Sequence, residues 1–460
     1  MPFRPWTRWK SDRAQPSALS QELARLCADP RVHRVFEWFS RHERDISDFQ
    51  LAISAVPAPS FAEQARAAWL RQQLEPFGLS PTTDAAGNLL AARSGRHPGS
   101  PAVAVSAHLD TVFSALTPLN IRREQARLLG PGISDNGSGL AALWALAGAF
   151  HHVGIVTAAP LLFVANVGEE GEGNLRGMRH LYRQHLGTAA VADPVPAPAI
   201  ALLIALDGAG IDNVISQALG SRRFEIVISG PGGHSWSDHG APNPIVAAAR
   251  AIGTLCRLPL PTNPRTTLNI GSIEGGTSIN TIPERAVLKV DIRSCDPARI
   301  NELEQHLRSA VADACDELHT HSSHLQHAIT VVGERPAGEL PAGSPLLAAI
   351  RAVDAQLGIQ AQFLRASTDA NIPLSLGLDA IALGAGGSGG GAHTLHEWFD
   401  PSGREQALKR LVLLILLLAG LAPESAQSDA LPANAPHVTD LPAANVPDDA
   451  APASDFPEPN

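Results

Sequence analysis

The sequence predicts an α/β fold, with helices on both sides of a sheet, into which an α+β domain is inserted. Two patterns support this prediction. In the first part of the chain, short runs that are apolar throughout alternate with helical stretches, as in a sheet that is buried on both faces. In the middle of the chain, apolar and polar residues alternate, as in antiparallel strands covered on one face, and the first pattern then resumes.

The N-terminal part is predicted to be helical after a loose leader over residues 1–17. Helical patterns of apolar residues cover residues 18–27 and 32–54. The prolines of the segment VPAPS then end one element, and a third helix follows. Ser60 is the expected N-cap residue of that helix.

Four apolar runs are predicted to form buried strands of the main domain. They cover residues 102–107, 161–167, 199–206 and 379–385. The alternating segments RRFEIVISG, TTLNIGSI and ERAVLKVDIRS predict strands of the inserted domain, which also contains two helical stretches. We therefore expect a main domain in two parts, 18–216 and 336–422, with an inserted domain over 217–335.

The negative charge of the chain is concentrated in its last segment, residues 423–460. This segment is rich in Pro and Ala, and we expect it to be disordered because it has little apolar surface to bury. Removing its seven acidic residues from the net charge of −10 leaves −3 for the rest of the chain, since the segment has no Lys or Arg. A nearly neutral body argues against nucleic acid as a partner.

Nothing in the sequence indicates a membrane or secreted protein. The longest aliphatic run, 411–422, would rise only about 18 Å as a helix, which is short of a bilayer core of roughly 30 Å. The N-terminus is basic but lacks the apolar region of a secretory signal, and the four cysteines form no disulfide framework. We therefore expect a cytoplasmic protein with no membrane partner.

Side chains that commonly bind metal ions occur where the predicted strands end and at two glycine-rich turns. They are His108, Asp110, Asp135, Glu169, Glu170, Asp207 and His393, with His396 as a competitor for the last place. Open α/β sheets place their sites at the carboxyl ends of the strands, and nitrogen and carboxylate ligands suit Zn²⁺ and similar ions. Asp110 is placed to hold the ring of His108, and the pair Glu169-Glu170 indicates one ligand beside one general base.

Seven motifs, in the same order, resemble those of the M20 family of di-metal peptidases and deacylases. They are SAHLDTV, GISDNGSGLAAL, VGEEGEG, ALDGAG, GPGGHSW, GGTSINTIPERAVLKVDIR and GGGAHTLHEW. The resemblance covers about residues 45–422. The M28 family uses similar ligands but lacks a large inserted domain, so the long separation between Asp207 and His393 favours M20.

The resemblance implies a di-zinc exopeptidase-like catalytic domain with a mixed sheet, and a dimerisation or lid role for the inserted domain. It implies five metal ligands: His108, Asp135, Glu170, Asp207 and His393, with Asp135 bridging two ions. It also implies that Asp110 orients His108, that Glu169 is the general base, and that His234 reaches the oxyanion across a dimer. Arg293 and Asn280 match positions that hold the carboxylate or backbone of the substrate. The Asp135-Asn136 peptide bond resembles one that is commonly cis.

The function implied is hydrolysis of the amide bond of short peptides, as in tripeptide aminopeptidase or glutamate-type carboxypeptidase. A hydroxide held between two divalent metal ions would attack the carbonyl carbon, with zinc favoured over cobalt or manganese. The alternative is an N-acyl-amino-acid deacylase, similar to acetylornithine deacetylase and succinyl-diaminopimelate desuccinylase. A catalytically inactive dimeric scaffold is a remote alternative, because no expected catalytic side chain is missing.

Overall fold

A nine-stranded sheet, called here the main sheet, contains all four predicted buried strands. The computed structural model describes residues 16–183, 199–319 and 324–423. The strand order is β1-β2-β6-β3-β7-β17-β8-β15, with β16 beside β8. The strands are β1 (Thr82–Thr83), β2 (Leu89–Arg93), β3 (Ala102–His108), β6 (Leu161–Asn166), β7 (Ile200–Leu206), β8 (Asn213–Ala218), β15 (Gly338–Glu339), β16 (Gln362–Ala366) and β17 (Asp379–Leu383).

The main sheet is mixed. Strands β6, β3, β7 and β17 lie side by side in this order and are parallel to one another. At the two ends of this group, β2 pairs antiparallel with β6 and β8 pairs antiparallel with β17. Every residue of β3 and β6 is buried, as their continuous apolar sequences require. The predicted α/β class is therefore confirmed.

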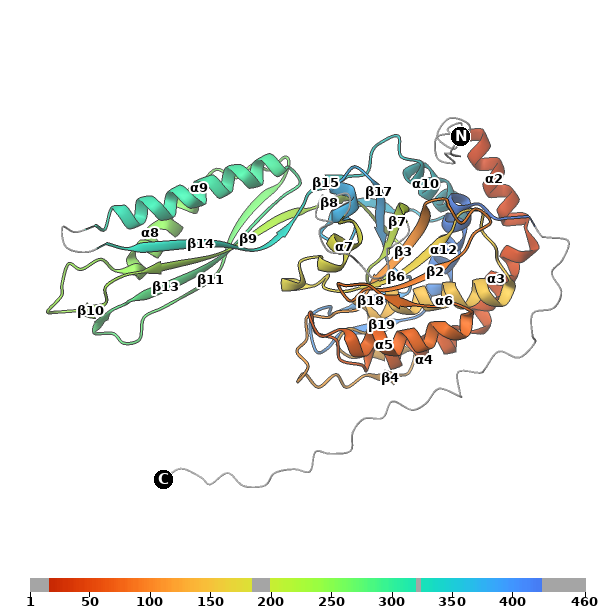
Figure 1. Cartoon of the computed structure of the whole chain (residues 1–460), viewed down its shortest axis with the longest axis horizontal. Coiled ribbons are helices and arrows are strands. Elements are labelled where there is room, and N and C mark those ends of the chain that lie inside the picture. Colours follow the sequence, from red (N-terminus) through yellow and green to blue (C-terminus); the bar gives the residue numbers. More distant parts are fainter. Residues whose placement is uncertain (1–15, 184–198, 320–323, 424–460) are drawn as a thin grey trace, which may run out of the picture. The chain divides into compact units, whose positions relative to one another are not determined.

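Helices pack against the main sheet from segments far apart in the sequence (Figure 1). Helix α6 contacts β3, β6 and β7, α12 also contacts β3, and α11 contacts β8 and β17. The helices of this part are α2 (Pro16–Ala28), α3 (Pro30–Arg41), α4 (Glu43–Ser54), α5 (Gln64–Leu74), α6 (Gly137–Val153), α7 (Arg176–Leu181), α10 (Pro345–Leu357), α11 (Asn371–Ser375) and α12 (Arg404–Ala419), with the 3-10 turns η1 (Glu75–Phe77) and η2 (Gly171–Gly173).

Two helix predictions were wrong in detail. The helix expected over 32–54 is interrupted at His42, whose N–H and ring both bond the carbonyl oxygen of Trp38. Ser60 is not the N-cap of α5, which begins at Gln64. The Ser60 hydroxyl instead donates to the Asp110 carboxylate, a contact between distant segments that local sequence cannot show.

A separate antiparallel sheet, called here the second sheet, has the order β11-β13-β9-β14. Apolar side chains of β9 at alternate positions, Phe224, Ile226 and Ile228, share a core with side chains of α8 and α9, as the alternating pattern predicted. These elements are β9 (Gly220–Ser229), α8 (Pro244–Leu255), β11 (Thr266–Gly275), β13 (Arg285–Ser294), α9 (Pro297–Asp316) and β14 (Gln326–Arg335), and the short strands β10 (Gly233–His234) and β12 (Thr281–Ile282) pair with each other.

The chain enters and leaves the second sheet through two neighbouring segments. Leu219 lies between β8 and β9, and Pro336 follows β14. The amide nitrogen of the buried Asn371 donates to the carbonyl oxygen of Leu219 at 2.9 Å and to that of Pro336 at 3.0 Å. One side chain therefore holds both crossings together. The domain boundaries expected from the sequence stay a prediction.

A small third sheet was not predicted from the sequence. It has the order β18-β19-β5-β4 and consists of β4 (Arg122–Glu124), β5 (Arg127–Leu129), β18 (Ser388–Gly390) and β19 (Trp398–Asp400). These strands are only three residues long, which is too short for an alternating pattern to be recognised. The third sheet holds both ends of the loop that carries His393.

The aliphatic run near the end of the chain forms most of α12. From Leu411 to Ala419 every residue of α12 is buried. Within the described residues, no helix combines the length and apolar character that crossing a membrane requires. The predicted disordered tail lies outside the described residues from residue 424 onward, and so does the leader, except for Pro16 and Ser17 in α2.

Candidate active site

The candidate metal ligands lie where strands of the main sheet end. His108 is the last residue of β3, and Asp207 directly follows β7. Glu169 and Glu170 follow β6 after a short turn. Because these three strands are parallel neighbours, their carboxyl ends meet at one edge of the sheet.

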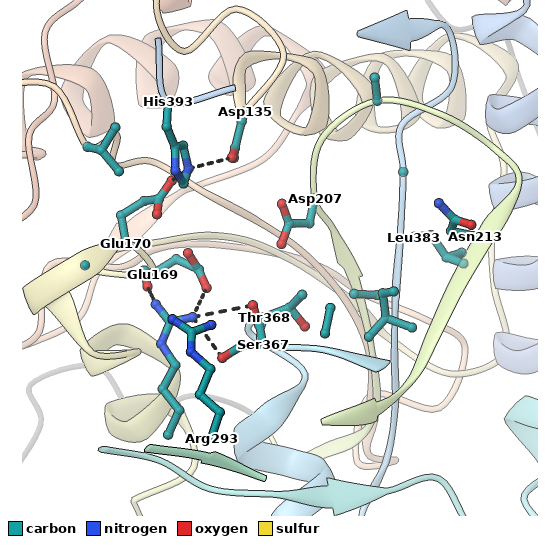
Figure 2. A pocket seen from close by; sticks show the side chains of 18 of the residues that line it. Asp135, Glu169, Glu170, Asp207, Asn213, Arg293, Ser367, Thr368, Leu383 and His393 are labelled. Carbon is teal, nitrogen blue, oxygen red and sulfur yellow. Dashed lines mark hydrogen bonds and ion pairs between the residues drawn. The ribbon is translucent and has the colours of Figure 1, made fainter. Parts of the chain in front are cut away.

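Four of these side chains form a close cluster around Asp135. Nε2 of His108 lies 3.0 Å from Oδ1 of Asp135. Nε2 of His393 lies 3.2 Å from Oδ2 of Asp135 and 2.9 Å from Oε1 of Glu170. The two oxygens of Asp135 thus face different histidines, which would suit a carboxylate shared between two metal ions. Figure 2 shows His393, Asp135 and Glu170 turned toward one another.

Asp207 completes the cluster on the side of His108. Its Oδ1 lies 3.9 Å from Nε2 of His108. Burial and the negative charge of Asp135 raise the pKa of Asp207 to about 7. Asp207 and Glu170 are both close enough to Asp135 for like charges to repel, so a divalent cation among them would be stabilising.

Asp110 holds the turn that carries the two glutamates. Its carboxylate accepts hydrogen bonds from the backbone N–H groups of Glu169 and Glu170, both at 2.9 Å, and from the Ser60 hydroxyl at 2.7 Å. It also lies 3.5 Å from Nδ1 of His108, which is hydrogen-bonded to the backbone carbonyl oxygen of Asp110 at 3.0 Å. Burial alone would raise the pKa of Asp110, but these contacts outweigh burial and lower it to about 2. Asp110 therefore holds the glutamate turn through its carboxylate, and its backbone carbonyl contacts the His108 ring.

The loop that carries Asp135 is supported by Glu397, which the sequence did not single out. The Glu397 carboxylate is completely buried and accepts the N–H groups of Gly132 at 2.7 Å, Ser134 at 2.8 Å and Asp135 at 2.7 Å. After this loop, the Asp135-Asn136 peptide bond is cis, and the Asn136 side chain caps α6. Glu397 could have been noticed because it belongs to the motif that contains His393.

Glu169 is buried beside the cluster but does not belong to it. Its carboxylate pairs with Arg335, whose Nη1 lies 2.8 Å from Oε1 of Glu169. Burial raises the pKa of Glu169 to about 8, although the positive charge of Arg335 opposes this effect. A buried carboxyl group with a raised pKa beside candidate metal ligands is a candidate for a general base and acid.

A second buried carboxylate, Asp369, was also missed. Its Oδ2 accepts a hydrogen bond from Nδ2 of Asn166, which lies opposite His108 in the main sheet. Among the described residues, Oδ1 of Asp369 and Oδ1 of Asn166 have no hydrogen-bond partner. Burial and the charge of Glu169 raise the pKa of Asp369 to about 7. The sequence gives no signal for it, because a lone Asp in a turn is common.

A pocket of about 590 Å³ opens onto these groups. One part of its wall carries the acidic side chains of Asp135, Glu169, Glu170 and Asp207, with His393 beside them. Another part is basic, because Arg223, Arg293 and Arg335 reach it from adjacent strands of the second sheet. Arg293 pairs with Asp291 through its Nε at 2.6 Å, and within the described residues its two terminal nitrogens have no partner. Arg293 is thus a free cationic fork in the pocket (Figure 2).

His234 and Asn280 do not line this pocket. They lie beside each other where β10 pairs with β12, with the N–H of Ser235 donating to the Asn280 carbonyl at 3.0 Å. Both are exposed, and so are their neighbours Trp236 at 84% and Ile279 at 102%. The structure therefore brings Arg293 to the candidate site but leaves the other two residues outside the pocket of their own chain.

The donor set fits divalent metal ions. His108, Asp135 and Glu170 each offer one ligand atom, and these three atoms lie within 4.8 Å of one another. Two imidazoles and three carboxylates are the ligands that zinc and similar ions take. His108 with Asp207 could hold one ion and His393 with Glu170 a second, with Asp135 shared between them.

Comparisons of the sequence with known families give two matches. Residues 88–228 match the peptidase family M28, and residues 218–319 match the peptidase dimerisation domain of the M20 peptidases. A probable carboxypeptidase from Ajellomyces dermatitidis is 26% identical over 327 residues, which are 66% of this chain and 70% of that protein. Two further proteins of the same description are matched over half of their lengths.

Solved structures share the fold at low sequence identity. A tripeptidase from Staphylococcus aureus matches with a TM-score of 0.67 and 20% identity, over 82% of this chain and 98% of that one. A dinuclear metal binding peptidase of the M20 family from Bacillus subtilis matches with a TM-score of 0.61 and 16% identity, over 83% of this chain and the whole of that one.

The fold and these relatives define the class of the protein as a metallopeptidase or related amidohydrolase. Within this class, the dimerisation-domain match and the fold support a resemblance to the M20 family. The M28 match ends early in the second sheet, whereas the M20 dimerisation match covers most of it. The comparisons therefore support the M20 resemblance predicted from the sequence.

Proposed function

We propose that the protein is a di-metal exopeptidase that hydrolyses an amide bond of short peptides. The observation that carries the proposal is the position of Glu169, a buried carboxylate beside the ligand cluster and open to the same pocket. Two divalent ions, with zinc favoured and cobalt or manganese as substitutes, would polarise the scissile carbonyl and acidify a water molecule. Glu169 would accept the proton of that water and return it to the leaving amine.

The basic part of the pocket supports a substrate with a free α-carboxylate. The free fork of Arg293 can donate two parallel hydrogen bonds to a carboxylate. A substrate ammonium group would be repelled by this wall, since three arginines face only two nearby acidic partners, Asp291 and Glu169. This observation favours a carboxypeptidase-like enzyme over an aminopeptidase.

The second candidate is an N-acyl-amino-acid deacylase. Such substrates also carry an α-carboxylate next to the scissile amide, so Arg293 would hold them in the same way. The two functions differ in the group that contributes the scissile carbonyl. In a peptide this group is a residue with an amine, and in an N-acyl amino acid it is a simple acyl group.

A homodimer is part of the proposal. His234 and Asn280 lie outside the pocket of their own chain, beside two large exposed apolar side chains, which supports their use by a partner. A histidine donor aimed at the developing oxyanion would stabilise the transition state. We expect His234→Ala to lower kcat strongly; an unchanged kcat, or a fully active monomer in sedimentation, contradicts this role.

The test of the function is a metal-dependent assay. The protein is freed of metal with a chelator, supplied with Zn²⁺, Co²⁺ or Mn²⁺, and assayed with di- and tripeptides and N-acyl amino acids. Glu169→Gln should keep the metals and lose activity by several orders of magnitude, whereas the exposed neighbour variant Glu172→Gln should stay active. Activity retained by Glu169→Gln refutes the general-base role.

A further inference from the structure

The second sheet contributes a buried side chain to the general base within the same chain. Arg335 is the last residue of β14, and its guanidinium reaches Glu169, which follows β6 of the main sheet. Both side chains are 7% exposed. The pairing therefore joins two residues that are far apart in the sequence and come from different sheets.

The guanidinium binds Glu169 at two places. Nη1 donates to Oε1 of the carboxylate at 2.8 Å, and Nη2 donates to the backbone carbonyl of the same residue. Nη1 also contacts the Ser367 hydroxyl at 3.2 Å. Because the guanidinium is planar, holding both the backbone and the side chain of Glu169 restricts the rotation of its side chain.

The contact leaves one carboxylate oxygen available. Among the described residues, Oε2 of Glu169 has no hydrogen-bond partner, whereas Oε1 is occupied by Arg335. The neighbouring acidic side chains, Asp207 and Glu170, repel the Glu169 carboxylate, and the positive charge of Arg335 opposes this repulsion. Removing one partner of a buried ion pair leaves an uncompensated charge, so Glu169 depends on this arginine.

We propose that Arg335 is a positioning residue for Glu169: it holds Oε1 so that Oε2 is free to take the proton of the attacking water. This inference rests on the proposed function of Glu169 as the general base. Arg335 acts through Glu169 and makes no contribution to substrate affinity. Its role thus differs from that of Arg293, whose terminal nitrogens face the pocket without a partner.

The test separates turnover from binding. Arg335→Ala should lower kcat about 100-fold, as expected when a catalytic group is misplaced, with little change in KM. Arg335→Lys keeps the charge but not the two-pronged grip, so its kcat should fall less. Because Arg335 lines the pocket, added methylguanidinium should restore kcat of Arg335→Ala, and KCl at equal ionic strength should not.

The matched control is Arg222→Ala. Arg222 lies on the adjacent strand β9 and pairs with Glu304 and Glu334, but it does not line the pocket. Its variant should keep wild-type kcat and KM. The metal content and thermal melting of every variant show whether it is folded. If Arg335→Ala is not folded, Arg335→Lys provides the comparison with the wild type.

Three results would overturn the inference. The first is a raised KM with unchanged kcat, which would make Arg335 a substrate ligand. The second is unchanged kinetics, and the third is a folded Arg335→Ala variant with a low kcat that methylguanidinium does not restore. Glu169→Gln is measured in parallel. If that variant is active, the proposed function fails; if it is inactive while the Arg335 variants behave like the wild type, only the present inference fails.

Discussion

Glu397 has no place in the ligand cluster, yet it holds the loop that positions Asp135. Glu397→Ala would leave three backbone N–H groups without an acceptor. Since hydrogen bonds to a charged group each contribute about 1.5–3 kcal/mol, we expect the free energy of unfolding to fall by about 3 kcal/mol or more. Metal affinity should fall as well. Urea denaturation and metal titration measure both effects, and a fully stable variant with wild-type affinity contradicts this prediction.

The choice between the two histidines of the last motif can also be tested. His393 contacts Asp135 and Glu170, whereas His396 is exposed and, among the described residues, forms no hydrogen bond or ion pair with the cluster. His393→Ala should lose one bound metal ion per chain and most of the activity, while His396→Ala should retain both. Metal analysis by mass spectrometry decides between them, and equal losses in the two variants would contradict the assignment.

At the residue scale, the sequence predicted the cluster and the contact between Asp110 and His108, but not the other supports. The cluster could be predicted because each member follows a strand or opens a glycine-rich turn in a familiar order. Arg335, Asp369 and Glu397 act through contacts with residues more than 150 positions away, such as the pair Arg335 and Glu169. No local sequence pattern predicts such a contact, because the contact exists only after the chain has folded.

At the scale of elements, one buried ion pair joins α10 to α12. Nε and Nη2 of Arg410 bind the two oxygens of Asp354, both at 2.6 Å, and both side chains are buried. Asp354→Ala leaves Arg410 without its counter-charge and should cost about 3–5 kcal/mol of stability. The double variant with Asp354→Leu and Arg410→Met should lose less. Denaturation curves test this order, and a double variant less stable than Asp354→Ala would contradict it.

The predictions of helices and strands were correct where the apolar sequence pattern was long. The strands at 102–107 and 161–167 and the helix α12 have long apolar sequences, and burial of these sequences largely determined their structure. The break at His42 depends on a single side chain and its bond to Trp38. Single contacts of this kind do not alter the periodicity from which helices are predicted.

For the whole molecule, metal binding should be coupled to pH. Burial raises the pKa of Asp207 to about 7, and contact with Asp135 raises the pKa of His393 to about 9. Both groups must lose a proton to bind a metal ion, so metal affinity should increase from pH 6 to pH 9.

The metal-free protein should show the opposite trend in stability. A group whose pKa is raised by folding favours the folded state while it is protonated, and this contribution is lost as pH rises through the raised value. The Tm of the chelated protein should therefore fall between pH 5 and pH 9, and the increase in Tm on adding Zn²⁺ should grow. Thermal melting with and without metal tests this, and a pH-independent increase contradicts it.

The crossing held by Asn371 has a consequence for how such a chain can evolve. Because one amide nitrogen binds the carbonyls of Leu219 and Pro336, the two ends of the segment 220–335 lie next to each other. A segment whose ends are adjacent can be gained, lost or exchanged by recombination at one place in a gene, because a short splice closes the remaining chain. Peptidases with and without this segment can therefore share an ancestor, because a single hydrogen-bonded junction joins the segment to the rest of the chain.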